Sequence, residues 1–127
     1  EVIIPMQAQP FSVVGMSQLT DSVFSVQRKI NPKLHIMGIL LTMTQHTKVS
    51  EHYAADVRAR YGNKLRVFDT EIPYNVKVQE SQAFAAPTIL YKPKSSSAKA
   101  YVEFTKEVVG HGREEQVYER DEDARDR

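Results

Sequence analysis

Side chains able to do chemistry are few and scattered in this sequence. It contains no cysteine, which excludes a thiol nucleophile and a thiolate metal site. It also has no phosphate-binding loop of the G-x-x-x-x-G-K-[ST] or G-x-G-x-x-G type and no H-E-x-x-H metal signature. His46 and His52 are six residues apart, which does not place them on one helical face. Ser12, Ser50 and Ser95–Ser97 stand where helices would begin and are interpreted as N-caps. The residues therefore predict no catalytic group and no metal site.

Composition points to one soluble globular domain. The 127 residues are 41% hydrophobic and 26% charged, with a net charge of +1, and no apolar run approaches the roughly 20 residues of a membrane span. We expect a cytoplasmic protein without membrane contact, and nucleoid association remains open. Residues 113–127 hold four Arg and seven acidic residues, which leaves +4 for the remainder. A mildly basic body of this kind permits contact with nucleic acid without requiring it.

The stretch from His35 to Met43 is the expected centre of the fold. It is almost continuously apolar, as in a strand buried on both faces of a parallel sheet. Ligands of such sheets bind beyond the carboxyl ends of the strands. The residues that follow Met43, and those at the ends of neighbouring strands, are therefore the first candidates for function.

The remaining elements alternate around this strand. Apolar residues three or four apart predict helices, and short apolar runs predict strands. In order, the sequence predicts a strand at 2–6, a helix from Ser12 to Ile30, the central strand, a helix from Thr47 or Ser50 to Gly62, a strand at 65–68, a loop at 69–77, a short edge strand within 83–91, and a helix from Ser95–Ser97 to Gly110. This order predicts a three-layer α/β fold with a parallel sheet of three to four strands over residues 1–110. Residues 111–127 are predicted to form a charged, disordered tail.

Four blocks of the sequence, in order and at nearly constant spacing, resemble the second half of the ParA/Soj chromosome- and plasmid-partitioning ATPases. They are Val2–Leu19, Asn31–Met43, Val67–Ser81 and Tyr91–Tyr101. The resemblance implies half of a P-loop NTPase fold. Family members have a deviant Walker A loop, bind ATP and Mg, dimerise around ATP, bind DNA non-specifically and respond to a ParB-like partner. The family's Walker A and Walker B motifs precede the first residue here, so the expectation is a C-terminal fragment without ATPase activity of its own.

The resemblance places a nucleotide-base site at Ile72-Pro73-Tyr74-Asn75. Family members hold adenine with the matching proline and asparagine, so it implies Pro73 and Asn75 as base contacts, with Thr42 and Met43 as neighbours at the adjacent strand end. An asparagine amide can donate to and accept from a purine edge. From the residues alone, a simple turn is the alternative, because Pro and Asn favour turns.

The resemblance also implies a DNA-binding surface. The family commonly has arginines after the central strand and within I-P-R-N-V-R, where this chain has His46 and Lys48, then Tyr74 and Lys77. Lys48 and Lys77, helped by Arg58 and Arg60, are therefore the expected phosphate contacts. The alternative is a solvated helix face.

Three interpretations follow. The leading one is the C-terminal part of a ParA-type ATPase, whose partners are the absent N-terminal half, a ParB-like protein and DNA. A second is a stand-alone, non-catalytic module that pairs with a partition ATPase or its partner. A third is an unrelated α/β binding domain. The first strand would lack its neighbour from the absent half, so we also expect self-association through that edge.

Overall fold

The structure is a computed structural model. It describes residues 1–10 and 12–125, and side chains up to residue 110 apart from 13 and 14. Three parallel strands, β1 (Val2–Gln7), β2 (Ile36–Thr44) and β3 (Ile72–Pro73), form a sheet in that order. The helices are α1 (Ser12–Lys29), α2 (Lys48–Tyr61), α3 (Val76–Ala83), α4 (Thr88–Tyr91) and α5 (Ser96–Arg125). The predicted parallel α/β fold is confirmed. None of the helices in the described part of the chain has the length and apolar content that crossing a membrane requires.

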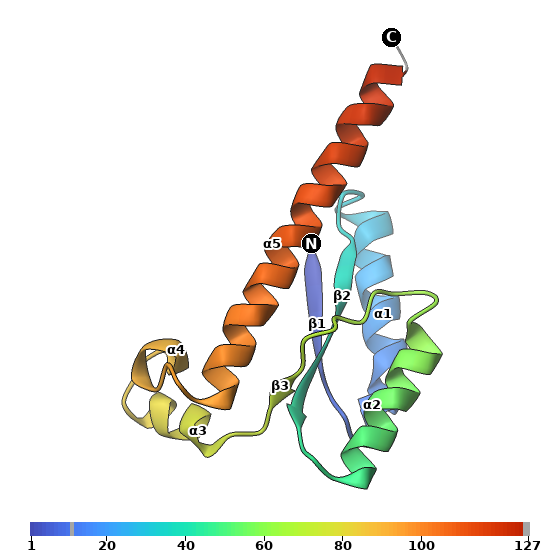
Figure 1. The fold of residues 1–127 in the computed structure, drawn as a ribbon. Coiled ribbons are helices and arrows are strands. Elements are labelled where there is room, and N and C mark those ends of the chain that lie inside the picture. The colour runs from blue at the N-terminus through green and yellow to red at the C-terminus, as the bar shows by residue number, and fades with distance from the viewer. Residues whose placement is uncertain (11, 126–127) are drawn as a thin grey trace.

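The sheet separates two apolar clusters. On one side α1 and α2 contribute Met16, Ala54 and Val57, which pack with Ile39 and Leu41 of β2. On the other side α5 packs Phe104 and Val108 against a cluster that includes Leu40 and Phe68. Figure 1 shows this layering, with α5 crossing one side of the strands and α1 and α2 on the other. The central strand is covered on both faces, as its unbroken apolar sequence predicted.

A bulge and a glycine adapt β2 to its neighbours. The register steps from Val2 opposite Ile36 to Ile3 opposite Gly38, so Met37 is an extra residue on β2, as in a β-bulge. Beyond it, Gly38 lies under Phe68: a Cβ at Gly38 would be 2.8 Å from Phe68 Cε2 and 3.0 Å from the Arg66 carbonyl. Only glycine lets this aromatic ring lie against the strand.

The third strand differs from its prediction. Residues 65–68 form a single parallel bridge, between Val67 and Ile39, whereas β3 lies at Ile72–Pro73, which was expected to be loop. From the bridge between Ile39 and Val67 to the pair of Thr42 and Ile72, β2 advances by three residues. Over the same distance, the segment that pairs with it advances by five. The two additional residues leave the ladder, so the strand is interrupted.

Side chains from helices on both faces of the sheet form hydrogen bonds with the backbone of this interrupted segment. Glu107 of α5 accepts hydrogen bonds from the backbone N–H groups of Asp69 (2.8 Å) and Thr70 (3.0 Å). From the other side Arg58 of α2 donates to the Phe68 carbonyl (3.0 Å). These contacts satisfy backbone groups that the ladder would otherwise pair.

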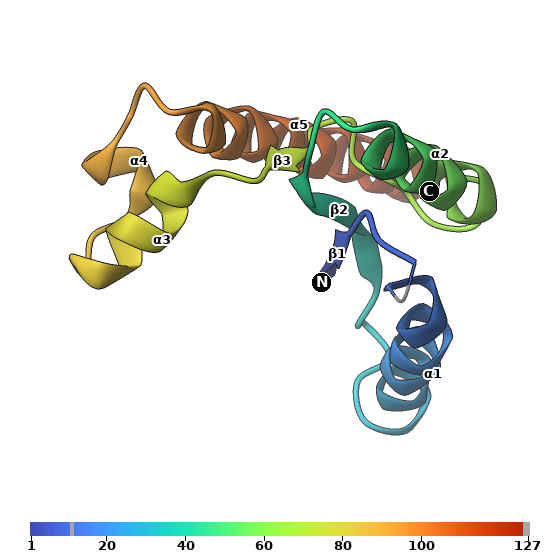
Figure 2. The ribbon, with the colours of Figure 1, turned by 90° about the horizontal axis from the view of Figure 1, so that it is seen from below.

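Three further expectations need correction. Residues 76–77 were expected as loop and no helix was predicted after them, but Val76–Ala83 form α3, because Asn75 caps a helix there. The edge strand expected within 83–91 is wrong, since Thr88–Tyr91 is the short helix α4. The last helix does not end at Gly110, because its backbone continues to Arg125. Figure 2 shows α3 and α4 projecting beyond β3, away from β1 and α1.

Several boundaries agree with the sequence. Thr47 is the N-cap of α2, and its side chain accepts from the Ser50 N–H. Ser95 caps α5, with its Oγ accepting from the Ala98 N–H at 3.2 Å. Helix α1 begins at Ser12, where the sequence placed its N-cap, and the residue before it lies outside the described part of the chain. The predicted disorder of residues 111–127 stays a prediction, because their side chains, and residues 126–127 altogether, also lie outside the described part.

Candidate functional site

The carboxyl ends of β2 and β3 meet at a small cavity. Thr42 pairs with Ile72 and Thr44 with Pro73, and the Tyr74 N–H donates to the Thr44 carbonyl at 2.9 Å. The cavity beside them has a volume of about 260 Å³ and is lined by Thr42, Met43, Ile72, Pro73, Tyr74, Asn75, Val78, Gln79, Gln82 and Tyr101. All four residues predicted to contact a nucleotide line it, although they come from two segments about thirty residues apart. It occupies the position where parallel sheets bind ligands.

Met43 has an uncommon backbone conformation at this cavity. Its φ is 54°, in the left-handed region that few non-glycine residues adopt and that costs on the order of 1–3 kcal/mol. Gln7, at the end of β1, donates from Nε2 to Met43 Sδ at 3.1 Å. This contact ties the end of the first strand to the wall of the cavity.

Asn75 is the N-cap of α3. Its Oδ1 accepts from the Lys77 N–H at 2.9 Å, and its Nδ2 donates to Ser96 Oγ at 2.9 Å. The alternative drawn from the sequence was a simple turn, whereas the structure places Asn75 at the start of a helix. An asparagine amide has a second donor hydrogen and a second acceptor lone pair, so one donor and one acceptor remain for a ligand. Ser96 also fixes which way the amide points.

The lining suits a flat heteroaromatic group. Pro73, Val78 and Tyr101 provide apolar and aromatic walls, and amides come from Asn75 and from the exposed Gln79 and Gln82. Ligand pockets usually measure roughly 300–1,000 Å³. At about 260 Å³ this one matches a base, and a whole nucleoside triphosphate would extend beyond it.

The sequence did not indicate Gln7, Gln79, Gln82 or Tyr101 as site residues. Residues 76–77 were expected as loop and no helix was predicted at 78–82, so the shared face of Gln79 and Gln82, three residues apart on α3, was not considered. In the sequence, Tyr101 was noted as the end of the block Tyr91–Tyr101 that resembles the family. Recognising Asn75 as an N-cap would have predicted α3 and with it the two glutamines.

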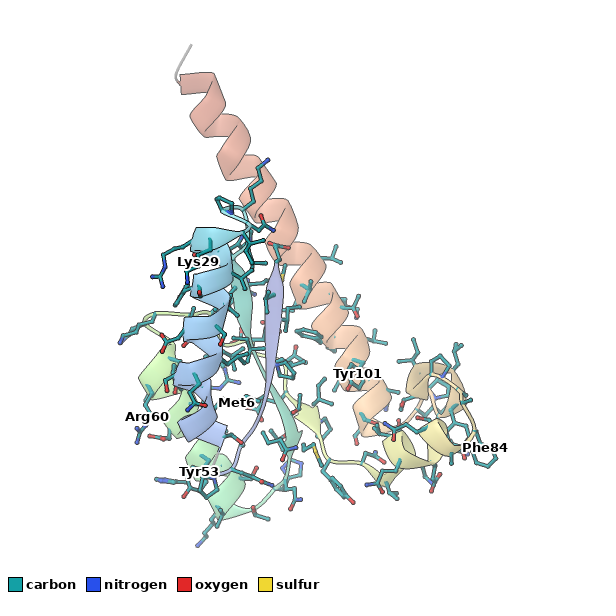
Figure 3. All side chains as sticks on the ribbon, turned by 180° about the vertical axis from the view of Figure 1, so that it is seen from behind. Met6, Lys29, Tyr53, Arg60, Phe84 and Tyr101 are labelled. Carbon is teal, nitrogen blue, oxygen red and sulfur yellow. The ribbon has the colours of Figure 1, made fainter. Side chains whose placement is uncertain are left out.

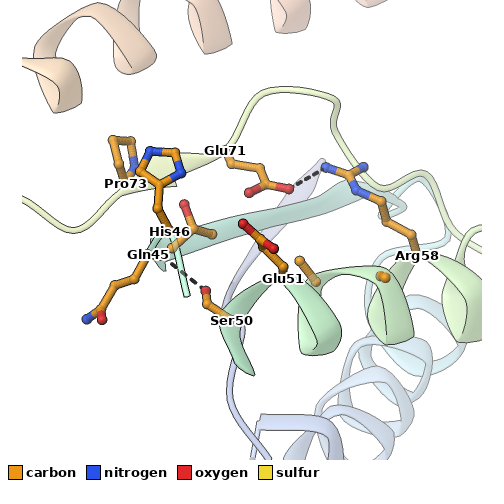
Figure 4. Close-up of a pocket in the computed structure, with 10 residues that line it drawn as sticks. Gln45, His46, Ser50, Glu51, Arg58, Glu71 and Pro73 are labelled. Atoms are coloured by element: carbon orange, nitrogen blue, oxygen red, sulfur yellow. Dashed lines mark hydrogen bonds and ion pairs between the residues drawn. The ribbon is translucent and has the colours of Figure 1, made fainter. Parts of the chain in front are cut away.

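A second cavity lies on the other side of Pro73. It has a volume of about 310 Å³ between the end of β2, α2 and β3, and its walls include His46, Glu51, Arg58 and Glu71. Figure 4 shows the Arg58–Glu71 ion pair crossing it, with 3.0 Å between Nη2 and Oε1. Arg58 also bonds the Phe68 carbonyl, so this side chain supports the interrupted third strand.

The structure does not gather the basic residues predicted to contact DNA. Lys48, Arg58 and Arg60 belong to α2 and Lys77 to α3, and these helices lie apart in both ribbon views. Arg60 pairs with Asp56 at 2.8 Å, and the hydrogen bond raises the pKa of Arg60. Lys48 is exposed, and no ion pair involves it among the described side chains.

Lys77 is also paired with a carboxylate. Its Nζ is 2.8 Å from Glu80 Oε1, one turn further along α3. The hydrogen bond raises the pKa of Lys77 and lowers the pKa of Glu80, and burial partly opposes both shifts. Lys77 therefore remains positively charged over the physiological pH range.

Fold and cavity together define an α/β domain with the arrangement of half a P-loop NTPase: parallel strands, helices on both faces and a base-sized cavity at the carboxyl ends of the strands. No protein-family profile matches the chain, but individual proteins do. It is 38% identical over 117 residues to the chromosome partitioning protein ParA of Caulobacter vibrioides, covering 91% of this chain and 43% of that protein.

Two further relatives carry related names. The sporulation initiation inhibitor protein Soj of Bacillus subtilis is 37% identical over 87% of this chain and 44% of its own length. The chromosome-partitioning ATPase Soj of Thermus thermophilus is 33% identical over 89% and 45%. This chain is homologous to the C-terminal part of ParA/Soj partitioning proteins. It spans less than half the length of these relatives.

Proposed function

We propose that this chain is the C-terminal portion of a ParA/Soj-type ATPase for chromosome or plasmid partitioning, and that it supplies the base-binding part of the nucleotide site. The observation that carries the proposal is 33–38% identity to partitioning proteins over about nine tenths of the chain. The convergence of Thr42, Met43, Pro73 and Asn75 on one cavity supports it.

Two cavity residues would contact adenine, one through apolar packing and one through hydrogen bonds. Pro73 would lie against the ring as a rigid wall, and Asn75 would present its remaining donor and acceptor to the purine edge. Ser96 and the Lys77 N–H keep that amide in position. ATP with Mg would supply the phosphoanhydride bond to be hydrolysed. These 127 residues contain no phosphate-binding loop signature, and we propose no hydrolysis by them alone.

The same homology supports proposals about the remaining functions of the intact protein. We propose ATP-dependent dimerisation, non-specific DNA binding, a ParB-like partner and a cytoplasmic or nucleoid-associated location. The intact site would need an N-terminal ATPase half to hold the phosphates. The free edge of β1, which among the described residues pairs only with β2, would be where that half or a second copy adds a strand.

A calorimetric titration with Mg-ATP tests the base site. Asn75→Asp is the informative variant, because an aspartate can still cap α3 but has no amide hydrogen to donate. We expect the affinity to fall about tenfold or more, the effect of losing one to two hydrogen bonds. GTP should bind more weakly than ATP to the wild-type chain.

Asn31→Asp is the matched control. Asn31 also accepts a backbone N–H, that of Lys33 at 3.2 Å, but does not line the cavity. It should bind ATP as the wild type does. No heat from the wild-type chain at millimolar nucleotide, or equal loss in both variants, would contradict the proposed base site.

A further inference from the structure

A concave surface lined by lysines lies beside the start of α5. It has a volume of about 550 Å³ and is formed by the start of α3, the segment after α4 and the residue before α5. Lys77, Lys92 and Lys94 belong to its lining, and none of the described residues that line it is acidic. We call this surface the lysine cleft.

Two of these lysines are available to a partner. Lys92 and Lys94 are exposed, and neither forms an ion pair among the side chains that the structure describes. Lys77, in contrast, is bound to Glu80 at 2.8 Å. From Ser81 to Val102 the sequence contains no acidic residue, so no carboxylate close along the chain neutralises Lys92 and Lys94.

The opposite charge is concentrated further along α5. Residues 114–123, the acidic segment, hold six acidic residues and one arginine, a net charge of −5, and the backbone of α5 continues through them to Arg125. Positions 115, 119 and 123 are all acidic, which is the four-residue spacing at which like charges repel one another in a helix. A positively charged partner would offset this repulsion.

The acidic segment does not reach the lysine cleft of its own chain. A helix rises about 1.5 Å per residue, so the 18 residues from Ser96 to Glu114 separate the two by about 27 Å. Figure 1 shows the far end of α5 pointing away from α3 and α4. The two oppositely charged surfaces therefore lie at different ends of the molecule, where each is open to another molecule.

We propose that the acidic segment of one copy of this chain docks in the lysine cleft of a second copy. The two surfaces differ, so the contact is head-to-tail and can repeat from one molecule to the next. Exposed pairs of lysine and carboxylate each contribute little free energy, so the contact is weak and sensitive to salt. It depends neither on nucleotide nor on the proposed base site.

Crosslinking with a carbodiimide, which joins a carboxylate to a lysine amine in direct contact, tests the pairing. Equal amounts of ¹⁵N-labelled and unlabelled complete chain are mixed, so a mixed-isotope product identifies a contact between two molecules. We expect such products to join Lys92 or Lys94 to acidic residues within 114–123. Their yield should fall about fivefold between about 10 and 150 mM salt, because the Debye length shrinks from about 30 to about 8 Å.

Static light scattering over a concentration series at about 10 mM salt measures the strength of the association. Lys92→Gln with Lys94→Gln should weaken it about fivefold, the effect of losing two exposed ion pairs. Association through the free edge of β1 would depend on backbone hydrogen bonds, and these substitutions would leave it unchanged.

Lys29→Gln with Lys33→Gln is the matched control, since it removes the same charge from exposed positions. Lys29 lies at the opposite end of the molecule from Phe84 in the α3–α4 region (Figure 3). The control should weaken association less than about twofold. Circular dichroism of both double variants should match the wild type, because the substituted lysines are exposed.

Three results would overturn the proposal. One is crosslinks of the acidic segment to Lys92 or Lys94 in single-isotope products only, which would place the contact within one chain. Another is an equal loss of association in the two double variants. The third is binding of polyglutamate by the wild-type chain, lost in the cleft variant, without any mixed-isotope crosslink, which would assign the cleft to an acidic partner other than a second copy.

Discussion

Replacing Glu107 should release the segment that leads into β3 and the cavity at its carboxyl end. Its carboxylate is largely buried, with 15% of the side chain exposed, and it accepts the N–H groups of Asp69 and Thr70. Hydrogen bonds to a charged group contribute about 1.5–3 kcal/mol each. Glutamine keeps one acceptor oxygen and loses the charge, so Glu107→Gln should cost about 2 kcal/mol of unfolding free energy, reduced where water reaches the exposed Asp69.

The pKa of Glu107 determines how the loss of stability in Glu107→Gln should change with pH. Burial alone would raise the pKa of Glu107, but the hydrogen bonds from Thr70, Asp69 and Arg66 together outweigh it, and the pKa lies below its ordinary value of 4.5. A lowered pKa in the folded state means that the stabilisation is complete above pH 4.5 and is lost as pH falls through the folded pKa. The difference between wild type and Glu107→Gln should therefore shrink from about pH 7 to about pH 3.

Urea denaturation followed by circular dichroism measures both effects. Glu103→Gln is the control on the same helix, since Glu103 is 60% exposed and, among the side chains that the structure describes, forms an ion pair only with the exposed Lys106. It should change stability by less than about 0.5 kcal/mol. The reasoning is refuted if Glu107→Gln is as stable as the control at neutral pH, or if its deficit is unchanged in acid.

Three further outcomes are expected. Gly38→Ala should destabilise the fold by about 1–3 kcal/mol in urea denaturation, because its Cβ would meet Phe68 and the Arg66 carbonyl. Gly15→Ala in α1 should not destabilise it, because a Cβ added there would meet no described atom within 4 Å outside its own stretch of helix. Arg58→Met should cost about 1–2 kcal/mol and speed amide hydrogen exchange at residues 68–71, and an unchanged exchange rate would disprove its supporting role. Light scattering after size-exclusion chromatography should show self-association through the free edge of β1, which a monomer at high concentration would contradict.

Local patterns were enough for much of the fold. The apolar run at 35–43 predicted the central strand, and helical spacing predicted α1 and α2 within a few residues of their bounds. The chain from 69 to 91 was predicted poorly. Residues 65–68 have strand composition, but only Val67 bridges to β2, and residues 76–83 are helical because Asn75 caps them.

The sequence by itself determined the fold class, the position of the central strand, the similarity to partitioning proteins and four residues that line the cavity at the carboxyl ends of β2 and β3. Only the tertiary structure decided where the third strand pairs, because Glu107 binds Asp69 and Thr70 from 38 and 37 residues away. It also decided which basic side chains remain available, because the carboxylates of Glu71 and Asp56 occupy Arg58 and Arg60 while Lys92 and Lys94 stay exposed. The spacing of apolar residues along the chain reflects only contacts that are local in the sequence. Polar contacts between distant segments depend on how the layers pack, and no local pattern contains that information.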